Sequence, residues 1–258
     1  MPMSVADHLA TLRAEGELLA AAADRTDLDT PVPTCPDWTL RDLLRHIGGV
    51  HRWAGYYVTT GYAEETSEEL DRELMETWGD DAELVGWFRA GHAALVTALT
   101  EAPDSLACWT FLPAPSPLAF WARRQAHETA IHRVDAQAAA GRITGVAPEF
   151  GADGLDELLL RFLTRRRHRP DGWGAPTRLG LTATDIDRRW LVTISESGVR
   201  GDDRPDAAAC AAADCVITAT ASDLYHLMWN RRDHAGLTVT GRPDVLDRWR
   251  TTMAVRWS

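Results

Sequence analysis

The chain has 258 residues and carries 38 acidic against 27 basic residues, which gives a formal net charge of −11. Such an acidic protein lacks the cationic surface that displaces counterions from phosphates, so we expect no nucleic-acid partner. The 45% hydrophobic and 25% charged residues are typical of a globular protein and exclude a disordered or collagen-like chain. No run approaches about 18 consecutive apolar residues, so no membrane span is expected. With no export signal and no Cys-x-x-Cys pair among four cysteines, a cytoplasmic protein without a zinc ribbon is predicted.

The first 170 residues show the 3.6-residue hydrophobic spacing of helices. Thr39 and Asp42 form a variant capping box at the start of one helix, and Pro117 suits the first position of another. Five helices are predicted, over approximately 5–23, 40–57, 81–102, 117–140 and 155–167. Antiparallel helices of this length predict a bundle, in which functional sites are built from side chains on facing helices.

Beyond Pro170 the hydrophobic period changes to the alternation of strands. Strands are predicted over 178–184, 190–195, 215–220 and 237–240. Helical spacing returns over 222–232 and in a short terminal helix over 242–250. The sequence therefore predicts two domains, a helical bundle over 1–170 and a small α+β domain over 171–258.

The segment HETAIHR, residues 127–133, holds the strongest chemical pattern. Glu128 and His132 lie one helical turn apart and project within about 40° of each other, so both can bind one ion. His127 and His132 are about 140° apart and cannot, so this is not the His-Glu-x-x-His motif of zinc proteases. Arg124, four residues before Glu128, can reach the same cavity. Arg133 is rotated by about 100° from His132 and is expected to face outward.

A third ligand is expected from a neighbouring helix, and His46 is the best candidate because it lies beside an apolar stripe. Two histidines and one carboxylate suit Zn²⁺, or Fe²⁺ or Ni²⁺, with an open coordination position. His92, His51 and His127 are competing candidates. Spacing alone also allows an ordinary polar pair on a helix and a histidine satisfied within the core.

Three segments carry a resemblance to a known family. VPTCPDWTLRDLLRHIGGVHRW (32–53) and RRQAHETAIHRVDAQ (123–137) resemble motifs of mycothiol-dependent maleylpyruvate isomerase-like proteins, members of the wider DinB-like metalloenzymes. CVITATASDLYHLMWNRR (215–232) and the segment after it are similar to that family's C-terminal domain. The resemblance implies a DinB-like four-helix bundle followed by a sterol-carrier-protein-like α+β domain.

The resemblance also implies site residues. It places the family's zinc ligands on His46, Glu128 and His132, with mycothiol, the low-molecular-weight thiol of actinobacteria, as co-substrate. An arginine of the C-terminal domain holds an anionic substrate in this family, and the matching residue is Arg231. The family more often has glycine where this chain has Asn230, so Arg232 and Arg124 remain alternative anchors.

These expectations together predict a zinc-dependent enzyme that uses mycothiol as nucleophile on a small electrophilic, carboxylate-bearing substrate. S-transfer is favoured over cis–trans isomerisation, because members of the family are diverse. The alternatives are a maleylpyruvate-type isomerase, a zinc-dependent hydrolase and a non-catalytic binding module. The expected assembly is a monomer or a homodimer.

Overall fold

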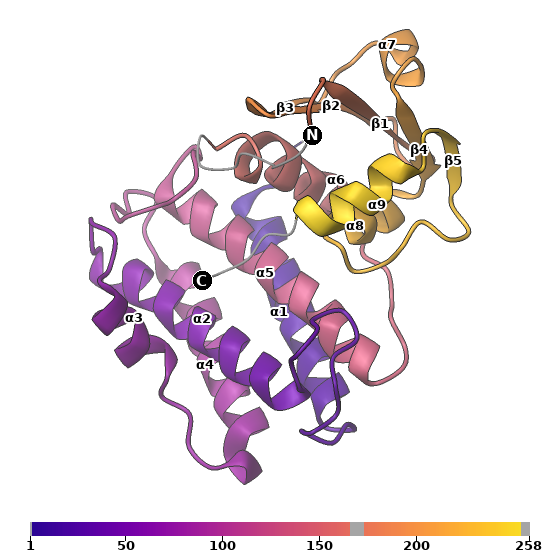
Figure 1. Cartoon of the computed structure of the whole chain (residues 1–258). Coiled ribbons are helices and arrows are strands. Elements are labelled where there is room, and N and C mark those ends of the chain that lie inside the picture. The colour runs from indigo at the N-terminus through magenta and orange to yellow at the C-terminus, as the bar shows by residue number, and fades with distance from the viewer. Residues whose placement is uncertain (1, 166–172, 254–258) are drawn as a thin grey trace. The chain divides into compact units, whose positions relative to one another are not determined.

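The structure, a computed structural model, describes residues 2–165 and 173–253 and divides into two compact units, 1–144 and 145–258 (Figure 1). The first unit is helical, and the second contains a small mixed sheet with helices. A helical N-terminal part followed by an α+β domain was predicted, and this prediction is confirmed.

The first unit is a four-helix bundle. It is formed by α1 (Val5–Ala23), α2 (Leu40–Thr60), α4 (Leu84–Glu101) and α5 (Pro117–Ala139). Both α1 and α2 pack against α4 and against α5, which closes the bundle around an apolar core. The connection from α2 to α4 contains α3 (Glu68–Met75) and the 3₁₀ turn η1 (Asp81–Glu83). Helix α3 was not predicted: it has only eight residues, and none of them is buried.

Local sequence explains where these helices begin. Ser4 and Asp7 form a capping box at α1, and Thr39 and Asp42 form the predicted one at α2. Each satisfies backbone N–H groups that have no partner within the helix. Ser116 caps α5, and Pro117 occupies its first turn, as predicted. Tertiary packing adds the rest of the stability, since every helix of the bundle contributes side chains that are fully buried.

Arg133 points toward α1 and not toward solvent. Its side chain is fully buried, and Nε donates a 2.6 Å hydrogen bond to Oε2 of Glu15 on α1. Nη1 donates to Gln137 on its own helix and to the carbonyl oxygen of Thr144. The prediction that Arg133 faces outward is therefore wrong. Rotation away from His132 directs the side chain at a second packed helix, which the helical period alone does not reveal.

The second unit is built on a mixed sheet. Its strands are β1 (Thr177–Ala183), β2 (Arg189–Ser195), β3 (Gly198–Asp202), β4 (Cys215–Ala219) and β5 (Thr238–Gly241). In the described residues their order is β3-β2-β1-β4-β5, with β1 and β4 parallel and the other neighbours antiparallel. Its helices are α6 (Pro148–Glu157), α7 (Ala207–Ala211), α8 (Ala221–Met228) and α9 (Asp244–Thr252). In β2, Trp190, Val192 and Ile194 alternate into the core, as the sequence pattern predicts.

The division between the units differs from the predicted boundary near residue 170. Helix α6 packs against α8, and the π-helical segment η2 (Leu158–Phe162) contacts β3. The chain before residue 170 therefore contributes to the core of the second unit. The helix predicted over 155–167 is α6 followed by η2, and residues 166–172, where the boundary was expected, lie outside the described residues.

The contact between α6 and α8 is close because Gly151 has no side chain. A Cβ atom built there would lie 2.9 Å from the carbonyl oxygen of Ala221. We expect Gly151→Ala to lower the free energy of unfolding by about 1–3 kcal/mol, because backbone must move. Gly86→Ala is the control: no atom lies within 4 Å of its Cβ position on α4, so about 0.5–1 kcal/mol of stabilisation is expected. Urea unfolding measures both changes in the free energy of unfolding. Equal changes in the two variants would contradict the close packing of α6 on α8 at Gly151.

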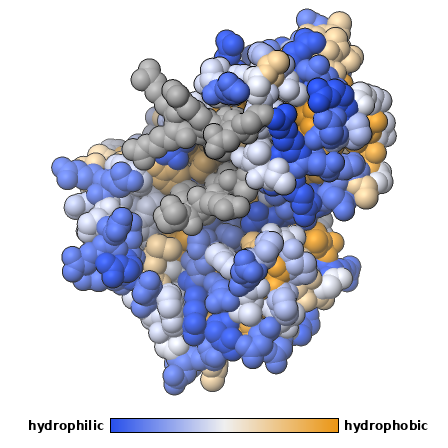
Figure 2. All heavy atoms as spheres, in the orientation of Figure 1, coloured by the Kyte–Doolittle hydropathy of each residue, from blue (hydrophilic) through white to orange (hydrophobic). Residues whose placement is uncertain are grey.

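The surface is mainly hydrophilic on the face drawn in Figure 2. Among the described residues, the large hydrophobic side chains that are exposed are Leu18, Tyr62 and Ile143. Over the same residues, no helix combines the length and apolarity that crossing a bilayer requires.

Candidate metal centre

Three predicted ligands meet inside the bundle of the first unit. His46 comes from α2, and Glu128 and His132 come from α5, which packs against α2. One donor atom of each residue lies within 4.8 Å of the other two. All three side chains are largely buried, with 15%, 5% and 7% of their surfaces exposed. The structure therefore brings the three residues together.

One oxygen of Glu128 lies between the two imidazoles. Oε1 is 3.2 Å from Nε2 of His132 and 3.6 Å from Nε2 of His46. Within the described part of the chain, neither Oε1 of Glu128 nor Nε2 of His46 has a hydrogen-bond partner. A buried polar atom without a partner costs about 1–3 kcal/mol. A cation among these atoms would remove that cost, so this donor set fits a divalent metal ion.

Asp135 fixes the orientation of His132. Its Oδ2 atom lies 2.9 Å from Nδ1 of His132, and its Oδ1 atom accepts a 2.5 Å hydrogen bond from Thr34 Oγ1. Since a carboxylate accepts, Nδ1 carries a proton, and Nε2 is the ring nitrogen that faces Glu128. Metal-binding histidines commonly donate their second N–H to a carboxylate in this way. Sequence analysis did not single out Asp135 or Thr34.

Arg124 reaches the same carboxylate, as predicted. Its Nη2 atom donates a 2.8 Å hydrogen bond to Oε2 of Glu128, and its side chain is 2% exposed. Glu128 therefore presents Oε2 to Arg124 and Oε1 to the two histidines.

The charges in this cluster shift its pKa values. Burial raises the pKa of Glu128, but the nearby imidazoles of His132 and His46 and the charge of Arg124 lower it by more, so the net pKa lies well below the usual range. Burial lowers the pKa of His46. For His132, burial lowers the pKa, but the contacts with Asp135 and Glu128 raise it by more, so the net shift of the pKa is upward. Glu128 is therefore ionised at neutral pH, as a metal ligand requires.

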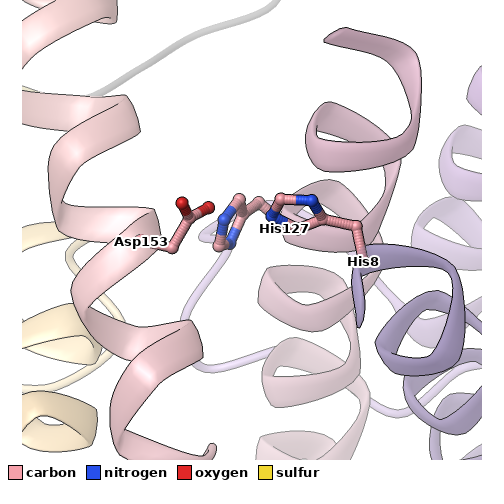
Figure 3. Close-up of side chains that lie close together, drawn as sticks. All are labelled: His8, His127 and Asp153. Atoms are coloured by element: carbon pink, nitrogen blue, oxygen red, sulfur yellow. The ribbon is translucent and has the colours of Figure 1, made fainter. Parts of the chain in front are cut away.

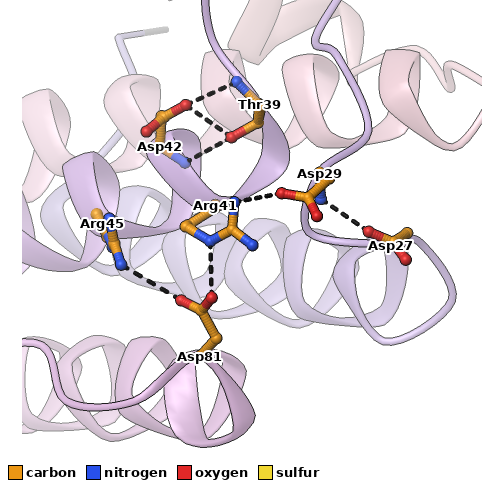
Figure 4. Close-up of polar contacts among 7 residues, drawn as sticks. All are labelled: Asp27, Asp29, Thr39, Arg41, Asp42, Arg45 and Asp81. Atoms are coloured by element: carbon orange, nitrogen blue, oxygen red, sulfur yellow. Dashed lines mark hydrogen bonds and ion pairs between the residues drawn. The ribbon is translucent and has the colours of Figure 1, made fainter.

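The start of α2 is anchored by charged residues (Figure 4). Arg41 donates to Asp29 at 2.5 Å and to Asp81 at 2.9 Å, and Arg45 also pairs with Asp81. These contacts join the loop before α2, the helix itself and η1. The side chains of Arg41 and Arg45 are 23% and 31% exposed, so these contacts lie at the surface of α2, whereas His46 on the same helix is 15% exposed and faces Glu128.

The loop before α2 also places an aromatic ring beside the ligands. Trp38 lies with its ring centroid 5.0 Å from that of His46 and 6.3 Å from that of His132. Backbone hydrogen bonds hold the loop in a tight turn, from Val32 N–H to the Trp38 carbonyl and from Trp38 N–H to the Cys35 carbonyl. The turn beside the two histidines is therefore part of the first segment that resembles the family, residues 32–53.

The competing histidines lie elsewhere in the bundle. His92 contacts the carbonyl oxygen of Leu12 at 2.9 Å, and His51 contacts Thr129 Oγ1 at 2.9 Å. His127 packs edge to face against His8, with ring centroids 6.2 Å apart (Figure 3). None of the three belongs to the group of His46, Glu128 and His132.

Arg231 belongs to the second unit and follows α8. Its Nη1 atom donates to the carbonyl oxygen of Trp229 at 2.9 Å, while Arg232 pairs with Asp223. Asn230 before it has a φ of 62°, in the left-handed region that favours glycine. Asparagine tolerates this region better than most residues, which explains how Asn230 adopts it.

Comparisons with known proteins agree with this architecture. A family model described as the mycothiol maleylpyruvate isomerase N-terminal domain matches residues 9–137, and that of the MDMPI C-terminal domain matches residues 149–248. No curated protein sequence matches the chain significantly. The crystal structures of the mycothiol-dependent maleylpyruvate isomerase and of a histidine-to-alanine mutant each match with a TM-score of 0.62 and 17% identity. Each match covers 92% of this chain and 93% of the other.

At 17% identity the likeness to these structures shows a shared fold. The two family models carry the assignment further, because together they account for most of the helical unit and most of the α+β unit. The chain belongs to the mycothiol maleylpyruvate isomerase family.

Proposed function

We propose that the protein is a metal-dependent enzyme in which His46, Glu128 and His132 hold one divalent ion, with Zn²⁺ preferred. The observation that carries this proposal is a pair of buried atoms, His46 Nε2 and Glu128 Oε1, that have no hydrogen-bond partner among the described residues and lie beside a histidine held by Asp135. Two imidazole nitrogens and one carboxylate oxygen form a ligand set that zinc enzymes use, with a further position open for another molecule.

The open position suits a thiol. A cation held there supplies the charge that keeps a thiol deprotonated at neutral pH. The family assignment makes mycothiol the proposed thiol, and the substrate is a small electrophile that carries a carboxylate. The indole ring of Trp38 lies beside the rings of His46 and His132. The contact with Asp135 fixes the orientation of the His132 ring, so this ligand is in place before substrate arrives.

The proposed outcome is S-transfer: the thiolate sulfur bonds to the electrophilic carbon, the displaced electron pair is protonated, and the adduct is released. Isomerisation is the second candidate, since both matched structures are of a mycothiol-dependent maleylpyruvate isomerase. In that reaction the adduct rotates about the former double bond and expels the thiol unchanged. Product mass distinguishes the two, because S-transfer consumes the thiol and isomerisation returns it.

Intact mass spectrometry of the native protein, with and without mycothiol, tests the proposal. One bound metal ion and one bound thiol are expected, and metal removal by a chelator is expected to abolish thiol binding. A protein with no metal would contradict the proposal and favour a binding module. Turnover of a carboxylate ester that needs metal but no thiol would instead favour a hydrolase.

Arg231 is the proposed anchor of the substrate carboxylate, because a planar guanidinium forms two parallel hydrogen bonds with it. We expect Arg231→Ala to lower kcat/KM by about 100-fold, a loss of roughly 1.5–3 kcal/mol for a hydrogen bond to a charged group. The bound metal is expected to stay at the wild-type level. Arg232→Ala is the matched control, and a larger loss in that variant would transfer the role to Arg232.

A further inference from the structure

Glu128 has two oxygens, and the structure assigns them different partners. We propose that Arg124 is a positioning residue that restricts Glu128 to a single ligand oxygen. The inference rests on the proposed metal site. Nη2 of Arg124 donates to Oε2 at 2.8 Å, whereas Oε1 faces Nε2 of His132 at 3.2 Å and Nε2 of His46 at 3.6 Å.

The contact between Arg124 and Glu128 is buried and joins two charged groups. The two residues are one turn apart on α5, and their side chains are 2% and 5% exposed, so water does not compete for the hydrogen bond. A hydrogen bond between two charged groups is roughly twice as strong as one between neutral groups. A carboxylate that rotated to offer both oxygens to a cation would have to break this bond inside the core.

This restriction has a consequence for the ligands that can bind. A carboxylate can bind a metal ion through one oxygen or through both, and the second oxygen would occupy a position that the thiol needs. Arg124 also offsets the negative charge of Glu128. Both effects act in the same direction, since a thiolate binds more tightly where a position is open and where more positive charge remains.

The test uses Co²⁺ in place of Zn²⁺, because the visible absorption of Co²⁺ weakens as its coordination number rises. We compare the wild type with Arg124→Met, which keeps the length of the side chain but has no donor, and with Arg124→Lys, which keeps a charged donor. Arg45→Met is the matched control: Arg45 precedes a proposed ligand in sequence, but its guanidinium pairs with Asp81. Dithiothreitol and mycothiol are titrated as thiol probes, and the thiolate-to-cobalt band gives the dissociation constant.

In Arg124→Met we expect a weaker visible band and a thiol dissociation constant about 10–100-fold higher, the usual cost of losing a group that orients a ligand. Arg124→Lys is expected to recover most of both, and Arg45→Met to match the wild type. If Arg124→Met does not fold, Arg124→Gln, with one neutral donor, replaces it. If Arg124→Met, or Arg124→Gln in its place, shows the wild-type spectrum and thiol affinity, the role proposed for Arg124 is wrong, but the metal site is not affected. Wild-type protein that binds no Co²⁺ would overturn the metal site itself.

Discussion

His46→Ala is expected to lower the affinity for the metal by more than about 100-fold, because losing a ligand costs more than the 10–100-fold of losing an orienting group. Turnover should fall to background with it. The metal-free variant should lose only about 1 kcal/mol of unfolding free energy, a typical value for a single substitution. The small loss follows from the structure, since Nε2 of His46 has no hydrogen-bond partner among the described residues.

His92→Ala is the matched control, because His92 is a buried histidine of the same unit that bonds to the Leu12 carbonyl oxygen. Its ring also fills the space over Gly16. We expect the opposite result, with metal stoichiometry unchanged and stability lowered by about 1–3 kcal/mol. Metal analysis and chemical unfolding give the metal content and the free energy of unfolding of both variants. A His46→Ala protein that retains the metal at wild-type affinity would rule out the proposed ligand set.

Arg133→Met is expected to lower the free energy of unfolding by about 3–5 kcal/mol, the cost of leaving one member of a buried ion pair without its partner. Glu15 would then lie inside the bundle without this partner, with its side chain only 9% exposed. The double variant Glu15→Leu with Arg133→Met removes both charges, and most of the loss should be recovered. Urea unfolding at neutral pH measures both.

The pair of Arg89 and Asp24 provides a comparison at the surface of the same unit, with both side chains about half exposed. We expect Arg89→Met to change stability by no more than about 1 kcal/mol. If Arg133→Met were equally mild, the contact with Glu15 would contribute little to the packing of α1 on α5.

Much of the candidate site is predictable from the sequence, because one rule governs it. Residues four apart on a helix share a face, and this rule pairs Glu128 with His132 and brings Arg124 to Glu128. An apolar stripe likewise predicts that His46 points inward. The rule says nothing about what lies opposite, so it does not show that Arg133 meets Glu15, which is 118 positions away in the sequence.

Contacts between distant segments explain the other differences. The hydrogen bond from Thr34 to Asp135 spans 101 positions, and no local pattern indicates it. Strand β3 was not predicted, because it contains two glycines and an aspartate, which are depleted in strands. It pairs with β2 and packs against η2, which lies well before the sheet in the sequence. The boundary between units depends on the packing of α6 against α8, which a change of hydrophobic period near residue 170 does not reveal.

The hydrogen bond from Thr34 to Asp135 ties the turn before α2 to the orientation of His132. In the proposed metal-bound state, the ion favours the conformation in which this turn is formed. By thermodynamic reciprocity, an ordered turn must favour the ion by the same free energy. The amide protons of Cys35 and Trp38, which close the turn, are then expected to exchange with solvent more slowly when metal is bound. Hydrogen exchange at these two amides thus reports metal occupancy without any knowledge of the substrate.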